Sequence, residues 1–307
     1  MSLETDLLID RRRLKRRLLF WRLLTFAAVI AVALMVVGPR MRGGGYVARI
    51  TVEGTITSDH KTVKALQDVL DDASARALLL IVNSPGGAVA AGEAIHDMVE
   101  RVAAKKPVVA VMGATAASAG FMISLPAARI IAHNSTLTGS IGVLLPTGEV
   151  SGLLRWLGIT DETLTSGPLK NVPSLTKPMT EQGRAVMQAL IDDLYDQFVG
   201  MVAKGRKMEP ARVRELADGR AYTGRQALAL GLIDAIGTET DARTWLEAER
   251  AIAATLPARD IRSETLRDKL FGDDAEGLFG GIVKTLLSQS VSLDGGWALW
   301  QPGVYRQ

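Results

Sequence analysis

The sequence predicts an α/β protein in which parallel β-sheets are covered by helices. Short apolar runs with the features of strands alternate with longer runs of helical periodicity. The strand-like runs span residues 46–54, 77–83, 107–112 and 129–133, and the helix-like runs span 61–74 and 89–104. Strands that are apolar on both faces and separated by helices are typical of a parallel sheet with helices on each side. In such sheets, binding and catalytic residues collect at the carboxyl ends of the strands.

Composition narrows the chemistry that this fold can carry. The chain has 307 residues, of which 48% are hydrophobic and 22% are charged, as in a globular protein with a substantial core. It contains no cysteine, which excludes a thiol nucleophile, a cysteine-based zinc site and a disulfide framework. The three histidines, His60, His96 and His133, match no metal-binding spacing. We therefore expect neither a metal nor another cofactor.

The N-terminal region has the order of a membrane anchor. Basic residues crowd positions 11–17, and the 21-residue, largely apolar stretch at 18–38, whose one charge is Arg22, would span roughly 30 Å as a helix. A cleaved signal peptide is the competing interpretation, but the stretch is long for one and no A-x-A-like cleavage site follows. We expect a cytoplasmic segment at 1–17, a transmembrane helix at 18–38 and a linker at 39–45, with the rest of the chain outside the cytoplasm.

Positive charge is concentrated in this N-terminal region. The formal net charge of the chain is +3, yet residues 1–45 contain nine Lys or Arg against three Asp or Glu. The remainder is thus slightly acidic and offers no basic face for nucleic acid. We expect no nucleic-acid partner.

Two motifs lie at the ends of predicted strands. NSPGG at 83–87 ends the second strand, and AASAG at 116–120 follows the third. Glycines let a backbone N–H approach a substrate carbonyl closely, as an oxyanion-binding turn requires. Taken alone, the first motif is more simply a tight turn between a strand and a helix. Ser118 in the second motif has small neighbours and a helix-like run after it, so it is either a nucleophile or a helix N-cap.

A serine nucleophile needs a base, and the residues alone leave two candidates. His133 ends a predicted strand, and histidine ordinarily titrates at a pKa of about 6.5. Lys170 lies in a turn-rich stretch, and a lysine acts as a base near neutral pH only when burial brings its pKa far below about 10.4. Residue chemistry does not choose between them, and an ordinary surface lysine is a third interpretation of Lys170.

Five motifs occur in a fixed order between about residues 46 and 240, and their order is more specific than any one of them. They are NSPGG, AASAG, STLTGSIGV, SGPLKNVPS and ADGRAYTGRQALALGLIDAIG. Together they resemble the short form of the signal peptide peptidase A family, whose members are membrane-anchored serine peptidases with a Clp-protease-like or crotonase-like fold. The resemblance implies that residues 46–240 form the peptidase core and that 241–307 form a C-terminal helical region for assembly.

The resemblance also implies the roles of individual residues. By similarity, Ser118 is the nucleophile, Lys170 is the base of a Ser/Lys dyad, and Ser140 orients the lysine. The oxyanion hole is implied to consist of the N–H groups of Gly87 and Ala119. Without the resemblance, Ser140 is more simply a turn serine.

Three positions depart from the family pattern. Ala119 stands where a glycine is usual, and Asn171 stands where an aspartate commonly follows the lysine. The change at 171 removes a negative charge that would favour the protonated lysine. His133 occupies a place similar to that of the catalytic histidine of the more distant Clp proteases. A Ser118/His133 pair therefore stays open as an alternative.

The family further implies a homo-oligomer whose chains enclose an apolar groove facing the lipid of the inner membrane from the periplasmic side. Its substrates would be signal peptides and other apolar peptides. In such relatives the base comes either from the same chain or from a neighbour, and because Ser118 and Lys170 share this chain, we expect a site in each protomer. Residues 217–237 are implied to form subunit contacts.

The remaining segments give weaker signals. Residues 180–204 have the apolar periodicity of an amphipathic helix, which favours a packing surface, and a further helix is expected at 240–254. Trp297 and Trp300 are suited to lipid, to a partner subunit or to the core. Two other functions remain as alternatives: a crotonase-type acyl-CoA enzyme, and a non-catalytic membrane scaffold that keeps the peptidase fold.

Overall fold

The computed structural model describes residues 21–22, 24–25, 28, 45–261 and 297–298. Contacts divide the chain into two units, Met1–Gly45 and Tyr46–Gln307. The expected transmembrane segment at 18–38 lies mostly outside the described residues. Among the residues that are described, no helix combines the length and the apolar character needed to cross a membrane.

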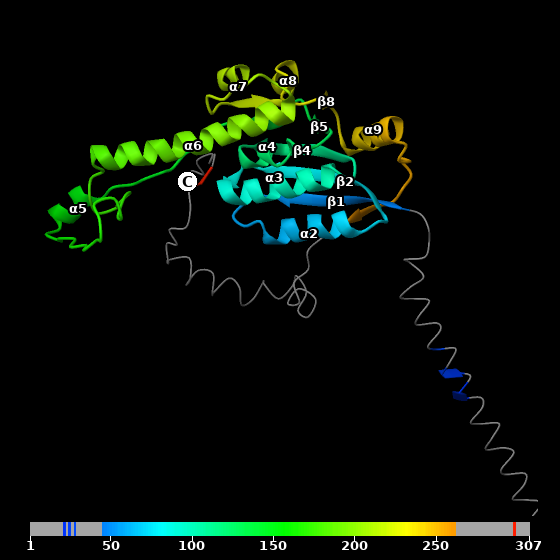
Figure 1. The fold of residues 1–307 in the computed structure, drawn as a ribbon, viewed down its shortest axis with the longest axis horizontal. Coiled ribbons are helices and arrows are strands. Elements are labelled where there is room, and N and C mark those ends of the chain that lie inside the picture. Colours follow the sequence, from blue (N-terminus) through cyan, green and yellow to red (C-terminus); the bar gives the residue numbers. More distant parts are fainter. Residues whose placement is uncertain (1–20, 23, 26–27, 29–44, 262–296, 299–307) are drawn as a thin grey trace, which may run out of the picture. The chain divides into compact units, whose positions relative to one another are not determined.

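The second unit is built on a sheet of eight strands, in which β1, β2 and β4 lie side by side and parallel (Figure 1). The strand order is β7-β6-β4-β2-β1-β9, and β5 pairs with both β4 and β8. Within this eight-stranded sheet, only the pairing of β6 with β7 is antiparallel, so the predicted parallel sheet is confirmed with one antiparallel edge. The strands are β1 (Tyr46–Glu53), β2 (Ala75–Ser84), β4 (Val108–Ala117), β5 (Arg129–Ala132), β6 (Leu137–Gly139), β7 (Ala221–Thr223), β8 (Ala235–Ile236) and β9 (Ala258–Asp260).

Helices cover both faces of this sheet, as the apolar central strands predict. Leu78 and Leu80 of β2 belong to one hydrophobic cluster with residues of α2, α3, α4 and α6. Ala77 and Leu79, which point to the other face, belong to a second cluster with residues of α9. The helices are α2 (His60–Asp71), α3 (Val89–Ala103), α4 (Ala119–Met122), α6 (Glu181–Arg206), α7 (Pro210–Leu216), α8 (Gly224–Ala229) and α9 (Glu239–Arg250).

One part of this unit projects beyond the sheet. It consists of α5 (Ser151–Trp156), the segments on either side of it and the N-terminal half of α6, and we call residues 143–190 the arm (Figure 1). The helix expected at 180–204 is confirmed as α6, but its apolar face is only partly covered. Phe198 in its C-terminal half is buried, whereas Val186 and Leu190 in the arm are 41% and 50% exposed. Among the described residues, only the C-terminal half of α6 thus uses its apolar face as the predicted packing surface.

Several boundaries differ from the predicted ones for identifiable reasons. β4 runs five residues beyond the expected 107–112, because β6 pairs with Thr115–Ala117 at its end. The helix expected after Ser118 is only the four residues of α4. α9 and β9 pack on the central sheet, with β9 paired to β1, although the sequence suggested a separate region beyond residue 240.

Candidate active site

The NSPGG motif forms a turn at the carboxyl end of β2, as expected. Ser84 ends the strand, and its Oγ accepts a hydrogen bond from the Gly86 N–H at 3.1 Å. Gly86 has a φ of 109°, a conformation that residues with a side chain rarely adopt. The two-residue strand β3 (Gly87–Ala88) follows and leads directly into α3. The turn therefore places the backbone of Gly87 at the end of the sheet where active sites collect.

Gly87 packs tightly against the backbone of Ile56, with which it forms an isolated β-bridge. A Cβ on Gly87 would lie 2.0 Å from the Ile56 carbonyl oxygen, so that no larger residue fits. The Ile56 N–H donates to the Gly86 carbonyl at 2.9 Å, and the Ala88 N–H donates to the Ile56 carbonyl at 2.8 Å. Because backbone groups alternate in direction along a strand, the N–H of Gly87 is directed away from Ile56. This N–H is the one that the sequence predicts as an oxyanion donor.

Ser118 lies at the turn between β4 and α4, and its backbone is strained. Its φ is 54° and its ψ is −121°, which a residue with a Cβ adopts only when the surroundings impose it. The residue is 3% exposed, and its N–H donates to the Gly139 carbonyl at 2.9 Å. Among the described residues, no hydrogen bond is found for the Ser118 hydroxyl, so the N-cap interpretation is not supported. Strain of this kind collects at functional sites.

Small residues let α4 press against the turn of β2. A Cβ on Gly120 would lie 2.7 Å from the Ser84 carbonyl oxygen. A Cβ on Gly92 of α3 would lie 2.9 Å from the Cβ of Ala119. The helix start is thereby fixed between β2, β3 and α3. The sequence prediction that small neighbours serve close helix packing is confirmed at these positions.

Ala119, the second predicted oxyanion donor, begins α4 and is completely buried. The first N–H groups of a helix have no partner within the helix, which leaves the Ala119 N–H free for another acceptor. The helix has only four residues, so few peptide dipoles align with it and its dipole at Ser118 is small. Any stabilisation of an oxyanion here would come from the N–H groups themselves rather than from a helix dipole.

Ser140 is brought next to Ser118 by the pairing of β4 with β6. Ala117 is the partner of Gly139 in that pairing, so the residues that follow them, Ser118 and Ser140, leave the sheet at the same edge. Ser140 also has a left-handed φ, of 47°, and its N–H donates to the Arg220 carbonyl at 3.0 Å. The structure therefore places these two predicted site residues together.

Lys170 is not joined to them in the described chain. It lies in the arm between α5 and α6, its side chain is exposed, and its N–H donates to the Gly167 carbonyl at 3.2 Å. Between residues 45 and 261, no hydrogen bond links its side chain to Ser118 or to Ser140. The sequence expected a lysine buried in an apolar cleft, and within one protomer that burial is missing.

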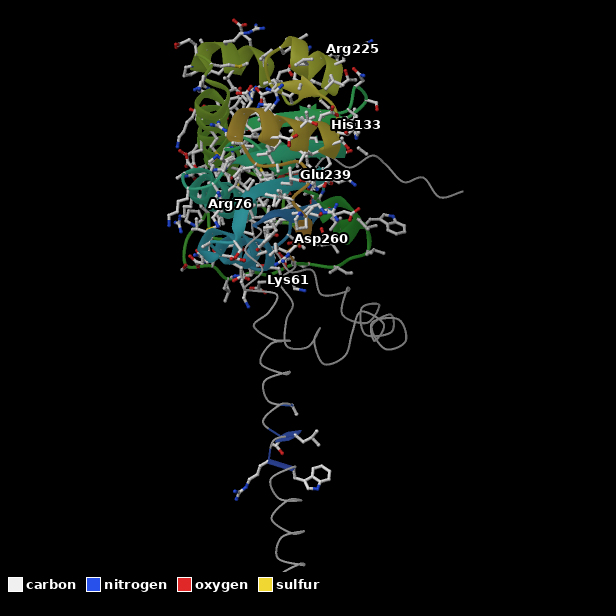
Figure 2. The ribbon with its side chains drawn as sticks, turned by 90° about the vertical axis from the view of Figure 1, so that its right-hand side faces the viewer. Lys61, Arg76, His133, Arg225, Glu239 and Asp260 are labelled. Atoms are coloured by element: carbon white, nitrogen blue, oxygen red, sulfur yellow. The ribbon has the colours of Figure 1, made fainter. Side chains whose placement is uncertain are left out.

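His133, the alternative base, follows β5 and is also exposed. Figure 2 shows it on the side of the molecule that carries Arg225, whose N–H donates to the carbonyl of Asn134 at 3.2 Å. The neighbour of β4 beside Ser118 is β6 rather than the end of β5, and the described residues show no hydrogen bond between His133 and Ser118. This arrangement gives the Ser118/His133 pair no structural support.

Comparison with known proteins places this geometry in a family. The sequence profile of peptidase family S49 matches residues 100–253, which is half of the chain and includes Ser118, Ser140 and Lys170. The chain belongs to peptidase family S49. The profile of the Clp proteases matches residues 48–140, in agreement with the Clp-protease-like arrangement of the central sheet.

Relatives of this S49 chain carry names that agree with the resemblance to signal peptide peptidase A. A Synechocystis sp. protein named as a protease is 39% identical over 75% of this chain and 84% of its own length. A protein of Enterococcus faecium named as signal peptide peptidase SppA is 40% identical over 61% of this chain and 55% of its own length. Protease 4 of Salmonella typhi is 37% identical, and this chain covers 34% of its length. The chain thus spans less than two thirds of the length of the last two relatives.

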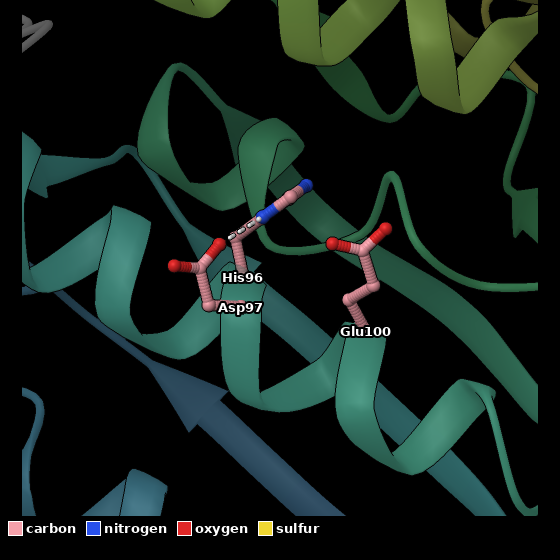
Figure 3. A group of neighbouring side chains, drawn as sticks. All are labelled: His96, Asp97 and Glu100. Atoms are coloured by element: carbon pink, nitrogen blue, oxygen red, sulfur yellow. Dashed lines mark hydrogen bonds and ion pairs between the residues drawn. The ribbon is translucent and has the colours of Figure 1, made fainter.

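One side-chain group of the S49 chain has the residue types of a metal site. His96, Asp97 and Glu100 of α3 place possible ligand atoms within 4.8 Å of one another (Figure 3). All three already have partners: His96 Nδ1 lies 3.1 Å from an oxygen of Asp97, and Glu100 forms an ion pair with Lys204. The pair of Glu100 and Lys204 ties α3 to α6, and we assign the group this structural role.

Sequence reasoning did not find two residues that shape the site. The Gly139 carbonyl anchors the N–H of Ser118, and its only signal is the glycine directly before Ser140. Ile56 fixes β3 from one side, and nothing in the sequence distinguishes it from other apolar residues near a strand end. Both act through backbone groups, which a side-chain motif does not reveal.

Proposed function

We propose that this S49 chain is a membrane-anchored serine endopeptidase that degrades remnant signal peptides and other apolar peptides. Residues 18–38 would be its single-pass anchor in the inner membrane, in contact with lipid, and residues 46–240 its peptidase core on the periplasmic side. The observation that carries the proposal is the strained backbone of Ser118, at the end of a central strand and at the start of α4, which packs against β3. A turn serine without a function gives no reason for that strain.

In this mechanism the Ser118 Oγ attacks the substrate carbonyl and Lys170 accepts the hydroxyl proton. Lys170 then donates that proton to the leaving amine, and a water activated by the same lysine hydrolyses the acyl-enzyme. Ser140 orients Lys170, and the N–H groups of Gly87 and Ala119 bind the oxyanion. One such donor is typically worth about 3 kcal/mol of transition-state stabilisation. The steps use the groups of the protein and water, and require no cofactor.

The exposed arm supports a homo-oligomer as the active form. Most of the large hydrophobic side chains that are exposed in the described residues lie in it, and a surface this apolar is typical of an interaction site. The most exposed are Leu153, Trp156, Leu157, Ile159, Leu164 and Leu175. A second copy would bury these side chains and would also enclose the neighbouring Lys170 in the apolar surroundings that a lysine base needs.

The projection of the arm further favours a base supplied between chains. The arm, which contains Lys170, projects beyond the sheet (Figure 1), and Ser118 follows a central strand of that sheet. We therefore propose that the Lys170 of one protomer serves the Ser118 of its neighbour, instead of the site within each protomer that the sequence suggests.

Labelling with a serine-directed fluorophosphonate tests the dyad. The full chain is solubilised in detergent and compared with Ser118→Ala, Lys170→Ala and His133→Ala under identical conditions. We expect the first two variants to lose labelling and His133→Ala to keep it. Loss in His133→Ala with labelling retained in Lys170→Ala would overturn the assignment of the base.

The same experiment separates the two other functions. An acyl-CoA enzyme of the crotonase type needs no serine nucleophile, and a scaffold needs no nucleophile at all. A wild-type chain that assembles but takes up no fluorophosphonate would contradict the peptidase and favour one of these. Binding of an acyl-CoA thioester would then distinguish the enzyme from the scaffold.

A further inference from the structure

β4 carries a register shift shortly before Ser118. Val82 of β2 pairs with Met112 of β4, and the next pair along the two strands is Ser84 with Ala116. Two steps along β2 thus correspond to four steps along β4. Residues 113–115 therefore form a bulge in β4.

The bulge brings Ser118 level with the oxyanion turn. Without the shift, Ser118 would be level with position 88, and with it Ser118 is level with Gly86. Each residue of a strand rises about 3.3 Å, so the two extra residues hold Ser118 back by roughly 7 Å. Bulges are common next to active sites, where they redirect a side chain. The serine is thereby set at the level of the turn that contains Gly87 rather than beyond it.

Asn83 holds the bulge from the side of β2. Its Oδ1 accepts a hydrogen bond from the Thr115 N–H at 3.2 Å. A Cβ on Gly113 would lie 3.1 Å from the same oxygen, so the glycine lets the bulge pack closely against this side chain. The carbonyl of Asn83 accepts the Gly54 N–H at 3.0 Å, which fixes Asn83 from the other side. A backbone N–H that the bulge removes from the strand pairing is thus satisfied by a side chain.

Thr136 holds the bulge from the opposite side, where β4 changes its neighbour. β5 pairs with β4 up to Met112, and β6 pairs with it from Thr115 onward. Thr136 lies between β5 and β6 and is 1% exposed. Its hydroxyl donates to the Gly113 carbonyl at 2.7 Å and accepts from the His133 N–H at 3.0 Å. This hydroxyl joins the bulge to the turn that leads into β6.

We propose that Asn83 and Thr136 are positioning residues for the nucleophile. Together they fix the bulge that sets Ser118 against the oxyanion turn on one side and against Ser140 on the other. Both act through the backbone of β4. The consequence for catalysis rests on the proposed peptidase function, whereas the bulge and its hydrogen bonds do not. A displacement of a reacting group by about 1 Å can cost roughly a hundredfold in rate.

Thr136→Val and Thr136→Ser test the hydroxyl in the full-length chain. Valine has a similar shape without the hydroxyl, and serine keeps the hydroxyl. We expect the limiting rate of fluorophosphonate labelling, at saturating probe, to fall by about 10- to 100-fold in Thr136→Val and by less than about threefold in Thr136→Ser. The probe concentration that gives half the limiting rate should stay unchanged in both. Equal limiting rates for the two variants would overturn the role of Thr136.

Tyr46→Phe is the control for a loss of stability alone. It removes a hydroxyl that donates to Asp72, and it lies at the amino end of β1, away from the strand ends that carry the site. This variant should label at the wild-type rate. A limiting rate in Tyr46→Phe as low as in Thr136→Val would overturn the positioning role.

Asn83→Asp and Asn83→Leu are the matching pair on the other side of the bulge. Aspartate keeps an oxygen acceptor for the Thr115 N–H, and leucine has a similar size without one. We expect Asn83→Leu to be slowed as much as Thr136→Val, and Asn83→Asp to label near the wild-type rate. Labelling of Asn83→Leu at the wild-type rate would overturn the role of Asn83.

Hydrogen exchange tests the bulge without any activity. In the wild type, the amides of Thr115 and Ser118 should be protected by their bonds to Asn83 Oδ1 and to the Gly139 carbonyl. In Asn83→Leu both should exchange about two- to tenfold faster, while the amide of Val111, which precedes the bulge, keeps its rate. An equal change at Ser118 and Val111 would show a general loss of stability and overturn the positioning. A wild-type chain that shows this protection but takes up no fluorophosphonate would contradict the peptidase and leave the bulge intact.

Discussion

Ser118 carries the clearest sign of function at the scale of a single residue, because its conformation opposes the preference of its own side chain. With a φ of 54° and a ψ of −121°, its backbone suits glycine better than any residue with a Cβ. We expect Ser118→Gly to be more stable than Ser118→Ala by roughly 1 kcal/mol, since both lose the hydroxyl but only glycine relieves the strain. The midpoints of urea denaturation of the two variants measure this difference.

Both variants should be inactive, which separates stability from catalysis. Ser140→Gly compared with Ser140→Ala is a second test of the same kind, because Ser140 has a φ of 47°. Equal midpoints for glycine and alanine at both positions would show that the backbone relaxes there without cost. In that case the strain would not support a functional reason for a serine at 118.

Tyr46 and Asp72 give the fold a pH dependence that can be assigned to one hydrogen bond. The Tyr46 hydroxyl donates to the Asp72 carboxylate at 2.7 Å. Burial, followed by this bond, raises the pKa of Tyr46 to about 12, and the bond from Tyr46 is the main reason that the pKa of Asp72 is lowered. The Asp72 contribution is thus present above its unfolded pKa of about 3.9 and is lost as the pH falls through the folded value. The Tyr46 contribution is lost only as the pH rises toward 12.

We therefore expect Tyr46→Phe to lower the free energy of unfolding by about 1 kcal/mol at pH 7 and by less at pH 3. Tyr222→Phe is the control, since the Tyr222 hydroxyl donates to the Leu216 carbonyl at 2.9 Å and a carbonyl does not titrate. Urea denaturation at both pH values measures the two differences. A Tyr46→Phe effect as large at pH 3 as at pH 7 would contradict the role of Asp72.

At this scale the sequence predicted the placement of Ser118 better than that of Lys170. Ser118, Ser140 and the turn at Gly87 lie at strand ends, where the sheet determines their neighbours, so the motifs and their order along the chain were sufficient to expect them near one another. Lys170 follows no strand, and it lies exposed in the arm. Its expected burial could not be derived from a motif, because burial depends on surfaces distant in the sequence.

At the scale of elements, the short helix α4 is positioned by the absence of side chains rather than by apolar packing alone. A Cβ on Gly120 would lie 2.7 Å from the Ser84 carbonyl, and a backbone atom cannot easily give way. We expect Gly120→Ala to push α4 off the end of β2, to cost about 1–3 kcal/mol of stability and to slow fluorophosphonate labelling of Ser118 by on the order of a hundredfold.

Gly200→Ala is the matched control for that substitution. Gly200 lies in α6, and a Cβ there would meet nothing within 4 Å. Alanine is favoured over glycine inside a helix, so this variant should gain up to about 1 kcal/mol and label at the wild-type rate. Equal behaviour of the two variants in denaturation and labelling would show that Gly120 does not position the nucleophile.

The elements that the sequence predicted are those with a clear hydrophobic period. The central strands, α2 and α3 bury a face along most of their length, α6 does so in its C-terminal half, and α9 buries Ala242 and Leu246; each was expected within a few residues of its observed range. β6 and α5 were not predicted. β6 has only three residues, too few to show a period, and α5 buries no residue at all, so its pattern does not identify an inward face.

At the scale of the whole molecule, the arm predicts self-association that depends on its apolar face. Leu190 of α6 is 50% exposed and lies on this face, whereas the exposed Gln188 lies about 200° around the helix axis from it, on the opposite side. Burial of a leucine is worth about 1.5–3 kcal/mol, so Leu190→Glu should raise the dissociation constant by roughly 10- to 100-fold. Gln188→Glu adds the same charge and should have little effect. Sedimentation velocity in detergent over a dilution series measures both.

Mixing two inactive variants shows which chain supplies the base to each site. Ser118→Ala retains Lys170, and Lys170→Ala retains Ser118, so each variant alone is inactive for a different reason. If Lys170 of one protomer serves the Ser118 of its neighbour, mixed assemblies contain sites in which both residues are intact. An intact site takes Ser118 from a Lys170→Ala chain and Lys170 from a neighbouring Ser118→Ala chain. With random mixing of equal amounts, about a quarter of the sites have this composition. We therefore expect labelling in the mixture to recover to about that fraction of wild type after dissociation and reassembly. If a mixture shown to contain both variants in one assembly recovers no labelling, the base comes from the same chain as the nucleophile. In that case Lys170 would have to leave its exposed position and approach Ser118 of its own protomer when the arm is covered.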